Sequence, residues 1–252
     1  MMNILIDFII PFIVIVNLAV FIHSMGHYIV AKIVGINVEL FSIGFGATLF
    51  SFSRNDTKWQ ICWLPIGGYV KIELKYDDEL SYRKKIIVSL AGPLFSILFF
   101  LIAVALFFLN NGATIYQEGQ QTIVSQSFWE AIISSINLFT ALIKSYAWVL
   151  YSIASGTRGM PHFELSPLFP NLGGISLVGF MLSEWSLKLG LVNLLPFPKC
   201  DGTKTIGLIT ASLYSPEKAD LVIKWIHRLM IFLIVILLGV AVWRDLEHLR
   251  VF

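Results

Sequence analysis

The chain has 252 residues, of which 57% are hydrophobic and 13% charged, and its formal net charge is +2. A water-soluble protein of this size needs a polar surface that this composition does not supply, so an ordinary soluble globular protein is excluded. We expect an α-helical polytopic membrane protein with one membrane-embedded domain over residues 1–252. The two cysteines, Cys62 and Cys200, are too few for a disulfide framework, and no nucleic acid is expected among the partners.

Five apolar stretches follow one another along the chain, and a helix needs about 20 such residues to cross the hydrocarbon core. The first is expected to form a helix within residues 1–35. We interpret it as retained, not as a cleaved signal peptide, because no basic segment precedes its apolar run. The same length criterion predicts further membrane helices at residues 86–110, 128–155, 175–202 and 221–243.

Residues 36–75 have a different pattern. Short runs of β-branched and aromatic residues alternate with glycines, among them Gly67 and Gly68, and this pattern is typical of short strands. Backbone that is not helical survives at membrane depth only where protein or a water-filled cavity satisfies its polar groups. We therefore expect a small membrane-re-entrant β-sheet beside the first helix.

Basic residues indicate which stretches cross the membrane. Seven lysines and arginines lie between the first two stretches, a second basic zone runs from Lys199 to Arg228, and residues 110–127 carry none. The positive-inside rule places both basic zones in the cytoplasm, which four crossings satisfy and five do not, with both termini outside. Residues 128–155, which hold Lys144 near their middle, are then expected to form a partly embedded amphipathic helix. A fifth span is the alternative.

The first helix contains the sequence His-Ser-Met-Gly-His from His23 to His27. Histidines four residues apart lie on one face of a helix, and this spacing lets both imidazoles reach one zinc ion. Histidines within a membrane segment are rare and costly, so they indicate function there. The alternative is a pair of core histidines bonded to the backbone or to each other.

A candidate third ligand, Asp201, lies in the segment from Asn193 to Gly202, where Pro196 and Pro198 end the preceding apolar stretch. Zinc held by two histidines takes a third protein ligand and keeps a further position for water. Taken alone, an aspartate here is more often the N-cap of the following helix.

Four blocks carry a resemblance to a known family: the histidine motif, residues 41–46, residues 65–71 with 91–93, and residues 193–202. In this order they resemble the site-two protease family of intramembrane zinc metalloproteases, and more closely its bacterial regulator-of-sigma-E branch. The resemblance implies Zn²⁺ bound by His23, His27 and Asp201. It also implies cleavage of single-span membrane proteins in regulated intramembrane proteolysis, within the lipid bilayer of a bacterial inner membrane. The active site would face the cytoplasmic side.

The resemblance also implies a substrate-binding role for the sheet, which would receive substrate as an added strand beside the cleft. The residues that would bind substrate come from this sheet and from the helix that ends near Asp201. They are Gly67, Gly68, Tyr69, Lys188, Asn193, Pro196 and Pro198.

The chain departs from the family pattern at Ser24, which stands where the family motif His-Glu-x-x-His has its glutamate. That glutamate takes a proton from zinc-bound water, and a serine hydroxyl is too weak a base to replace it. Lys188 stands where the family usually has asparagine, and residues 110–127 are too short for the PDZ domains of this branch. Cys200 is a conceivable substitute ligand, although a free cysteine is more often buried apolar filler.

Three functions stay open. The chain is an active zinc endopeptidase in which another group replaces the base, a pseudoprotease that binds transmembrane helices without cleaving them, or a transporter subunit that moves ions. The transporter has no need of residues 65–71 or 193–202. We expect the family function, intramembrane zinc proteolysis, impaired by Ser24.

Overall fold

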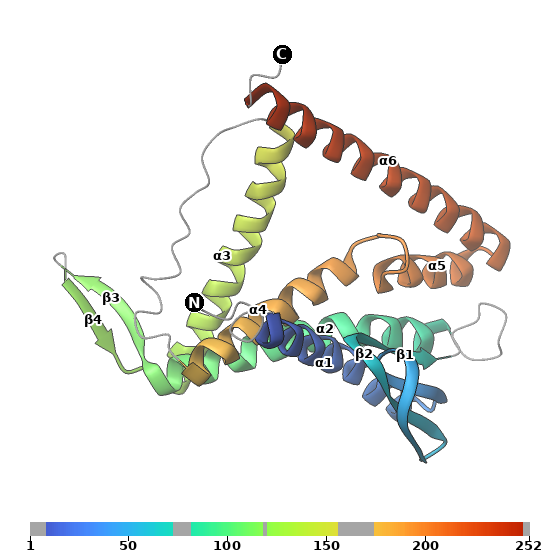
Figure 1. Ribbon diagram of the computed structural model, residues 1–252, viewed down its shortest axis with the longest axis horizontal. Helices are drawn as coiled ribbons and strands as arrows, with labels where there is room; N and C mark the ends of the chain where they lie inside the picture. Colours follow the sequence, from blue (N-terminus) through green and yellow to red (C-terminus); the bar gives the residue numbers. More distant parts are fainter. Residues whose placement is uncertain (1–8, 73–81, 118–119, 156–173, 249–252) are drawn as a thin grey trace. The chain divides into compact units, whose positions relative to one another are not determined.

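The computed structural model describes residues 9–72, 82–117, 120–155 and 174–248 (Figure 1). The chain divides into two compact units, which are considered one at a time. The first consists of residues 1–100 and 177–227, and the second of residues 101–176 and 228–252. All the residues predicted to bind metal or substrate lie in the first unit. The prediction of one domain over the whole chain stays a prediction.

Helices dominate the described residues, and two short sheets complete them. The helices are α1 (Ile10–Val34), α2 (Tyr82–Asn111), α3 (Phe128–Ser155), α4 (Gly174–Leu194), α5 (Asp201–Leu213) and α6 (Pro216–His248). The strands are β1 (Val38–Arg54), β2 (Thr57–Ile72), β3 (Ala113–Gln117) and β4 (Gln120–Val124).

Five helices of the described chain are long and apolar enough to cross a membrane. They are Ile10–Val34, Tyr82–Asn111, Phe128–Ser152, Leu177–Leu194 and Pro216–Trp243. This confirms a polytopic helical membrane protein with a small sheet. The helix α3 meets the same length criterion as the others and exposes Lys144, so its partly embedded placement stays a prediction beside the alternative of a fifth span.

The sheet after α1 is a long hairpin that folds back on itself. Its turn is at Asn55 and Asp56, whose φ angles of 49° and 58° are left-handed, a conformation that these two residue types tolerate. The first half of β1 pairs on one side with the end of β2, residues 68–72, and on the other with its start, residues 58–61. The bend at Gly44 has a φ of 84°, and a Cβ there would lie 2.6 Å from a carbonyl oxygen.

Large apolar side chains are exposed over the outer part of this sheet. Trp63 is 70% exposed and Leu49 65%, and Phe50 and Ile66 are each more than half exposed. Proteins in water rarely leave such patches uncovered. This exposure supports the expectation that the sheet contacts lipid.

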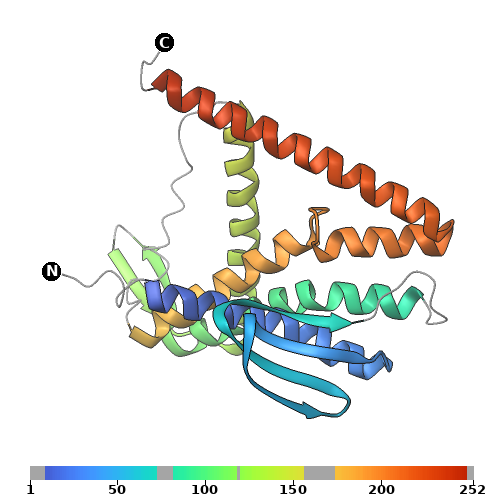
Figure 2. The same cartoon turned by 45° about the vertical axis from the view of Figure 1, so that its right-hand side comes forward.

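Within the first unit, α2 packs closely against both α1 and α4, and α1 runs beside the sheet (Figure 2). A Cβ added at Gly26 of α1 would lie 2.5 Å from the Phe95 side chain, and one at Gly190 of α4 would lie 2.9 Å from the Pro93 carbonyl oxygen. Small residues at these contacts let the helix backbones approach, as is common in membrane helix packing. The close approach brings the polar side chains of α2 within reach of both neighbours.

The second unit contains the hairpin β3–β4 and the whole of α3. The hairpin strands pair from Ala113 with Val124 to Gln117 with Gln120. At the start of α3 the Glu130 carboxylate accepts a hydrogen bond of 2.7 Å from the Ser127 backbone N–H, which is one half of a capping box. The hairpin was not predicted from the sequence.

Candidate metal centre

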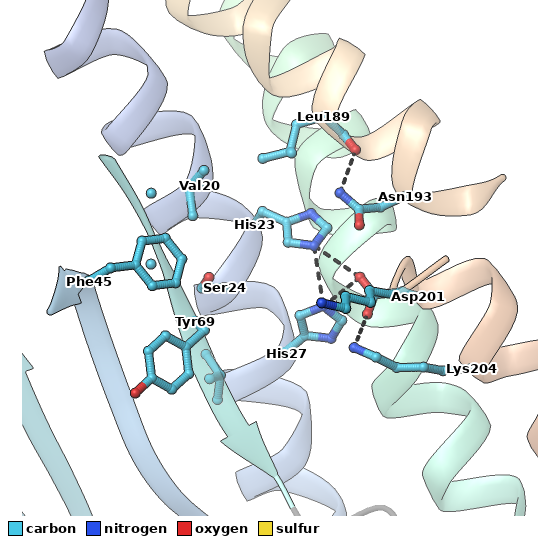
Figure 3. A pocket seen from close by; sticks show the side chains of 14 residues that line it. Val20, His23, Ser24, His27, Phe45, Tyr69, Leu189, Asn193, Asp201 and Lys204 are labelled. Atoms are coloured by element: carbon cyan, nitrogen blue, oxygen red, sulfur yellow. Dashed lines mark hydrogen bonds and ion pairs between the residues drawn. The ribbon is translucent and has the colours of Figure 1, made fainter. Parts of the chain in front are cut away.

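His23 and His27 project from one face of α1 toward Asp201, the first residue of α5 (Figure 3). Asp201 Oδ2 lies 3.1 Å from His23 Nε2 and 3.0 Å from His27 Nε2, and the two Nε2 atoms are 3.3 Å apart. Ligands of a tetrahedral zinc ion lie about 2.0–2.1 Å from the metal, and therefore about 3.3 Å from one another. The three side chains have the arrangement of three ligands around one small cation.

The helix α2 orients both imidazoles through their other ring nitrogen. His27 Nδ1 lies 2.7 Å from the Val88 carbonyl oxygen, which can only accept, so Nδ1 carries the proton and Nε2 keeps its lone pair. Ser96 Oγ lies 3.2 Å from His23 Nδ1 and is placed to accept its proton in the same way. Hydrogen bonds of this kind fix the ring orientation of metal-binding histidines.

Asp201 is held from both sides of its carboxylate and through its backbone. Lys204 Nζ donates to Oδ1 at 2.9 Å, which leaves Oδ2 directed at the histidines. The Ser89 hydroxyl donates to the Asp201 backbone oxygen at 3.2 Å. Three lone-pair donors thus meet in buried surroundings, an arrangement that a cation between them stabilises.

Asp201 is not the N-cap of α5, and Cys200 is a poor candidate ligand. The N-cap residue of α5 is Cys200, and the Asp201 side chain contacts the histidines and Lys204. Burial and the neighbouring carboxylate raise the pKa of the Cys200 thiol, which disfavours the thiolate form that binds metals. Among the described residues, the cluster with metal-ligand spacing consists of His23, His27 and Asp201.

A cavity of about 350 Å³ opens beside the three ligands. It brings together Ser24 and Asn193, which were singled out from the sequence, with the glycines and Tyr69 of β2. The other predicted substrate residues, Lys188, Pro196 and Pro198, are not among its lining residues. The lining consists of Val20, His23, Ser24, His27, Phe45, Gly67, Gly68, Tyr69, Val70, Leu189, Asn193, Lys199, Asp201 and Lys204.

Ser24 is buried on α1 and lines this cavity next to the ligands. Asp201 supplies the one carboxylate among the lining residues, and this carboxylate contacts the two histidines and Lys204. Glu39 of β1 is not among the lining residues and forms an ion pair with Lys71. The described residues therefore place no carboxylate where the family glutamate would stand.

Lys188 does not line the cavity, and its ammonium group contacts neighbours on α4. Its ammonium lies 2.8 Å from a carboxylate oxygen of Glu184, one turn earlier on α4, and 5.3 Å from the centre of the Trp185 ring. Its role in substrate binding stays a prediction, as do those of Pro196 and Pro198.

Several supporting residues were not found from the sequence. Ser89, Ser96 and Lys204 hold the ligands, and Asn17 of α1 binds the backbone of β2. Each is a polar residue within or beside an apolar helix, and that is the signal that singles it out. Which polar residue meets which ligand depends on helix contacts that the sequence does not contain.

The fold and the site together define a polytopic membrane protein with a candidate metal centre built from two histidines of one helix and an aspartate of another. A sequence model of peptidase family M50 matches residues 11–237, which is most of the chain. The chain therefore belongs to peptidase family M50, the family of the site-two proteases.

Bacterial relatives share part of the sequence. A presumed zinc metalloprotease of Mesorhizobium japonicum is 34% identical over 127 residues, covering 41% of this chain and 35% of the relative. One of Rickettsia conorii is 37% identical over 123 residues, covering 42% and 34%, and one of Agrobacterium fabrum is 47% identical over 78 residues, covering 31% and 20%. The match thus spans about a third or less of the length of these relatives.

Proposed function

We propose that the chain is an intramembrane zinc metalloprotease of the site-two type that cleaves single-span membrane proteins in regulated intramembrane proteolysis, and that its turnover is impaired by Ser24. The observation that carries this proposal is the meeting of three ligand atoms within 3.0–3.3 Å of one another beside a cavity. The location in a bacterial inner membrane is the one that the family resemblance implies, and it is part of this proposal. The basic zones support a site that faces the cytoplasm.

His23, His27 and Asp201 would hold Zn²⁺, and Lys204 would keep the carboxylate turned toward it. When bound, the ion supplies a Lewis acid that polarises a peptide carbonyl and lowers the pKa of a coordinated water. The residues of the chain would hold the substrate so that its peptide bond lies beside the metal centre. The end of β2 lines the cavity and pairs with β1 along one edge, so an extended segment could add to its other edge through backbone hydrogen bonds.

Ser24 explains why turnover would be slow. Hydrolysis of a peptide bond needs a group that accepts a proton from water and delivers one to the leaving amine. A serine hydroxyl is too weak a base for the first task at neutral pH. Substrate and metal binding do not require that group, so both are expected to persist.

Metal analysis tests the centre itself. Purified protein is expected to contain close to one zinc per chain and to lose it in His23→Ala, because two remaining ligands bind zinc poorly. Zinc that persists in both His23→Ala and Asp201→Ala would contradict the assignment.

A pseudoprotease is the second candidate, favoured by the serine in the cavity. It would bind transmembrane helices and release them uncut. Incubation with a radiolabelled single-span substrate separates the two functions: slow appearance of a cleavage product that depends on His23 supports the protease. Stable co-purification of intact substrate with no product supports the pseudoprotease.

A further inference from the structure

Asn17 of α1 connects the helix to the cavity wall. Its side-chain Nδ2 donates to the Ile13 carbonyl oxygen at 2.7 Å and also to the Pro65 carbonyl oxygen, while its Oδ1 accepts from the Gly67 backbone N–H at 3.0 Å. The Asn17 amide thus both donates to and accepts from the backbone of β2, at residues 48 and 50 positions further along the chain. Neither partner belongs to the metal centre.

The bonded segment, residues 65–67, interrupts the strand pairing. The register passes from the pair Phe45–Leu64 to the pair Ile43–Gly68, so residues 65–67 are skipped in the pairing of the two strands. In apolar surroundings, backbone groups that lack a strand partner need another one. Asn17 supplies one donor and one acceptor to this segment.

A second contact involves the same segment. The Phe45 ring lies 3.0 Å from the position of a Cβ at Gly67, and it stacks on the Tyr69 ring with centroids 5.8 Å apart. Gly67 has a φ of 86°, which a residue with a side chain rarely adopts. Asn17 and Phe45 therefore both contact residues 65–67, and Gly67–Tyr69 continue directly into the cavity lining.

We infer that Asn17 is a positioning residue that holds residues 65–67 against α1 and so sets the distance between the cavity wall and the metal ligands. Asn17 and His23 are six residues apart on one helix, which is about 9 Å along a rigid axis. The position of the cavity wall and the positions of the histidine ligands are thereby both fixed by α1. The consequence for substrate rests on the proposed function, because it assumes that substrate lies along this wall.

The first test needs no substrate. Spin labels at Ile66→Cys and at Ile33→Cys, both on exposed positions, report the distance between the wall and α1 in a chain whose Cys62 and Cys200 are replaced by alanine. We expect one narrow distance distribution in this chain and a broader or shifted one in Asn17→Ala. The variant Asn17→Asp keeps the acceptor for the Gly67 N–H and is expected to lie between the two.

The matched control is Asn110→Ala. The Asn110 amide donates only to its own helix, at 2.8 Å from the Leu106 oxygen, among the bonds of the described residues. It is expected to leave the distribution unchanged. An unchanged distribution in Asn17→Ala would overturn the inference, and so would a broadened one accompanied by loss of the cooperative thermal transition, since that result assigns Asn17 a role in folding alone.

The second test adds a single-span substrate and a photo-cross-linking amino acid in place of Tyr69. The starting chain is expected to cross-link to a narrow set of substrate positions. Loss of two hydrogen bonds should lower the yield at the main position at least about fivefold in Asn17→Ala and spread it to neighbouring positions. Equal yields and positions would overturn the inference. If the starting chain captures no substrate, the proposed function fails, and the distance measurement still decides the role of Asn17.

Discussion

Two glycines that bind no metal help to set the positions of the ligand atoms. At Gly92 of α2 a Cβ would lie 2.2 Å from His27 Nε2, and at Gly202 it would lie 2.2 Å from the Leu194 backbone oxygen. Both distances are far below van der Waals contact. The His27 imidazole and the turn before α5 therefore lie where the side chain of any residue larger than glycine, at position 92 or 202, would be.

Gly92→Ala is expected to displace the His27 imidazole and weaken zinc binding at least about 100-fold, because the ligand itself moves. Competition with a chelator of known affinity measures this change. Gly179→Ala is the control, since a Cβ at this helical glycine of α4 meets nothing within 4 Å. Equal zinc affinities in the two variants would show that His27 is not a ligand.

Ser24→Glu is expected to raise turnover of a single-span substrate at least about 10²-fold, the lower bound for a positioned general base. Initial rates of product formation give this ratio. A starting chain as fast as Ser24→Glu would mean that another group transfers the proton.

At this scale the sequence predicts the histidine pair, because a spacing of four places two side chains on one helical face. Asp201 is different. Its distance from the histidines along the chain carries no physical information about their proximity, so its place in the site came from the family resemblance. The roles of Lys204 and Asn17 were not predicted, because the groups that they bind are brought near them only by tertiary contacts.

Among the elements, α2 has the least expected role. It contributes no metal ligand, yet Val88, Ser89 and Ser96 each contact a different member of the ligand set. These residues occupy about two and a half turns of one helix. The element therefore acts as the common support of a centre whose ligands come from α1 and α5.

Ser96→Ala and Ser89→Ala are each expected to weaken zinc binding about 10- to 100-fold, because they remove hydrogen bonds that orient a ligand. The same chelator competition applies. Ser183→Ala is the matched control: Ser183 is equally buried, and its hydroxyl bonds the Phe180 oxygen of its own helix at 2.7 Å. If all three variants bind zinc alike, α2 does not support the centre.

The elements themselves were largely predictable. The apolar stretches, the sheet and their order follow from periodicity and composition. The way the hairpin folds back on itself could not be predicted. Its register depends on bends at glycines such as Gly44, and a strand pattern does not locate these bends. The helix α5 was missed as a separate element, since residues 175–202 were assigned to one span and the chain breaks after Leu194.

For the whole molecule, the open question is how often the chain crosses the bilayer. Four crossings predict that Lys84→Cys, in a chain without its native cysteines, reacts only with a reagent that reaches the cytoplasm, and that Asn111→Cys and Trp243→Cys react from outside. All three positions are exposed on described helices. A Trp243→Cys chain that reacts only from the cytoplasm would show that α3 crosses the membrane.

The serine in the cavity also bears on how much protein a cell would need. A chain that cuts rapidly acts many times, and a few copies suffice. A chain that holds its partner and cuts rarely acts about once per copy, so its effect depends on the ratio of the two proteins and saturates when the partner is in excess. Titrating expression level against the level of a single-span partner would reveal a threshold set by stoichiometry, which Ser24→Glu should abolish.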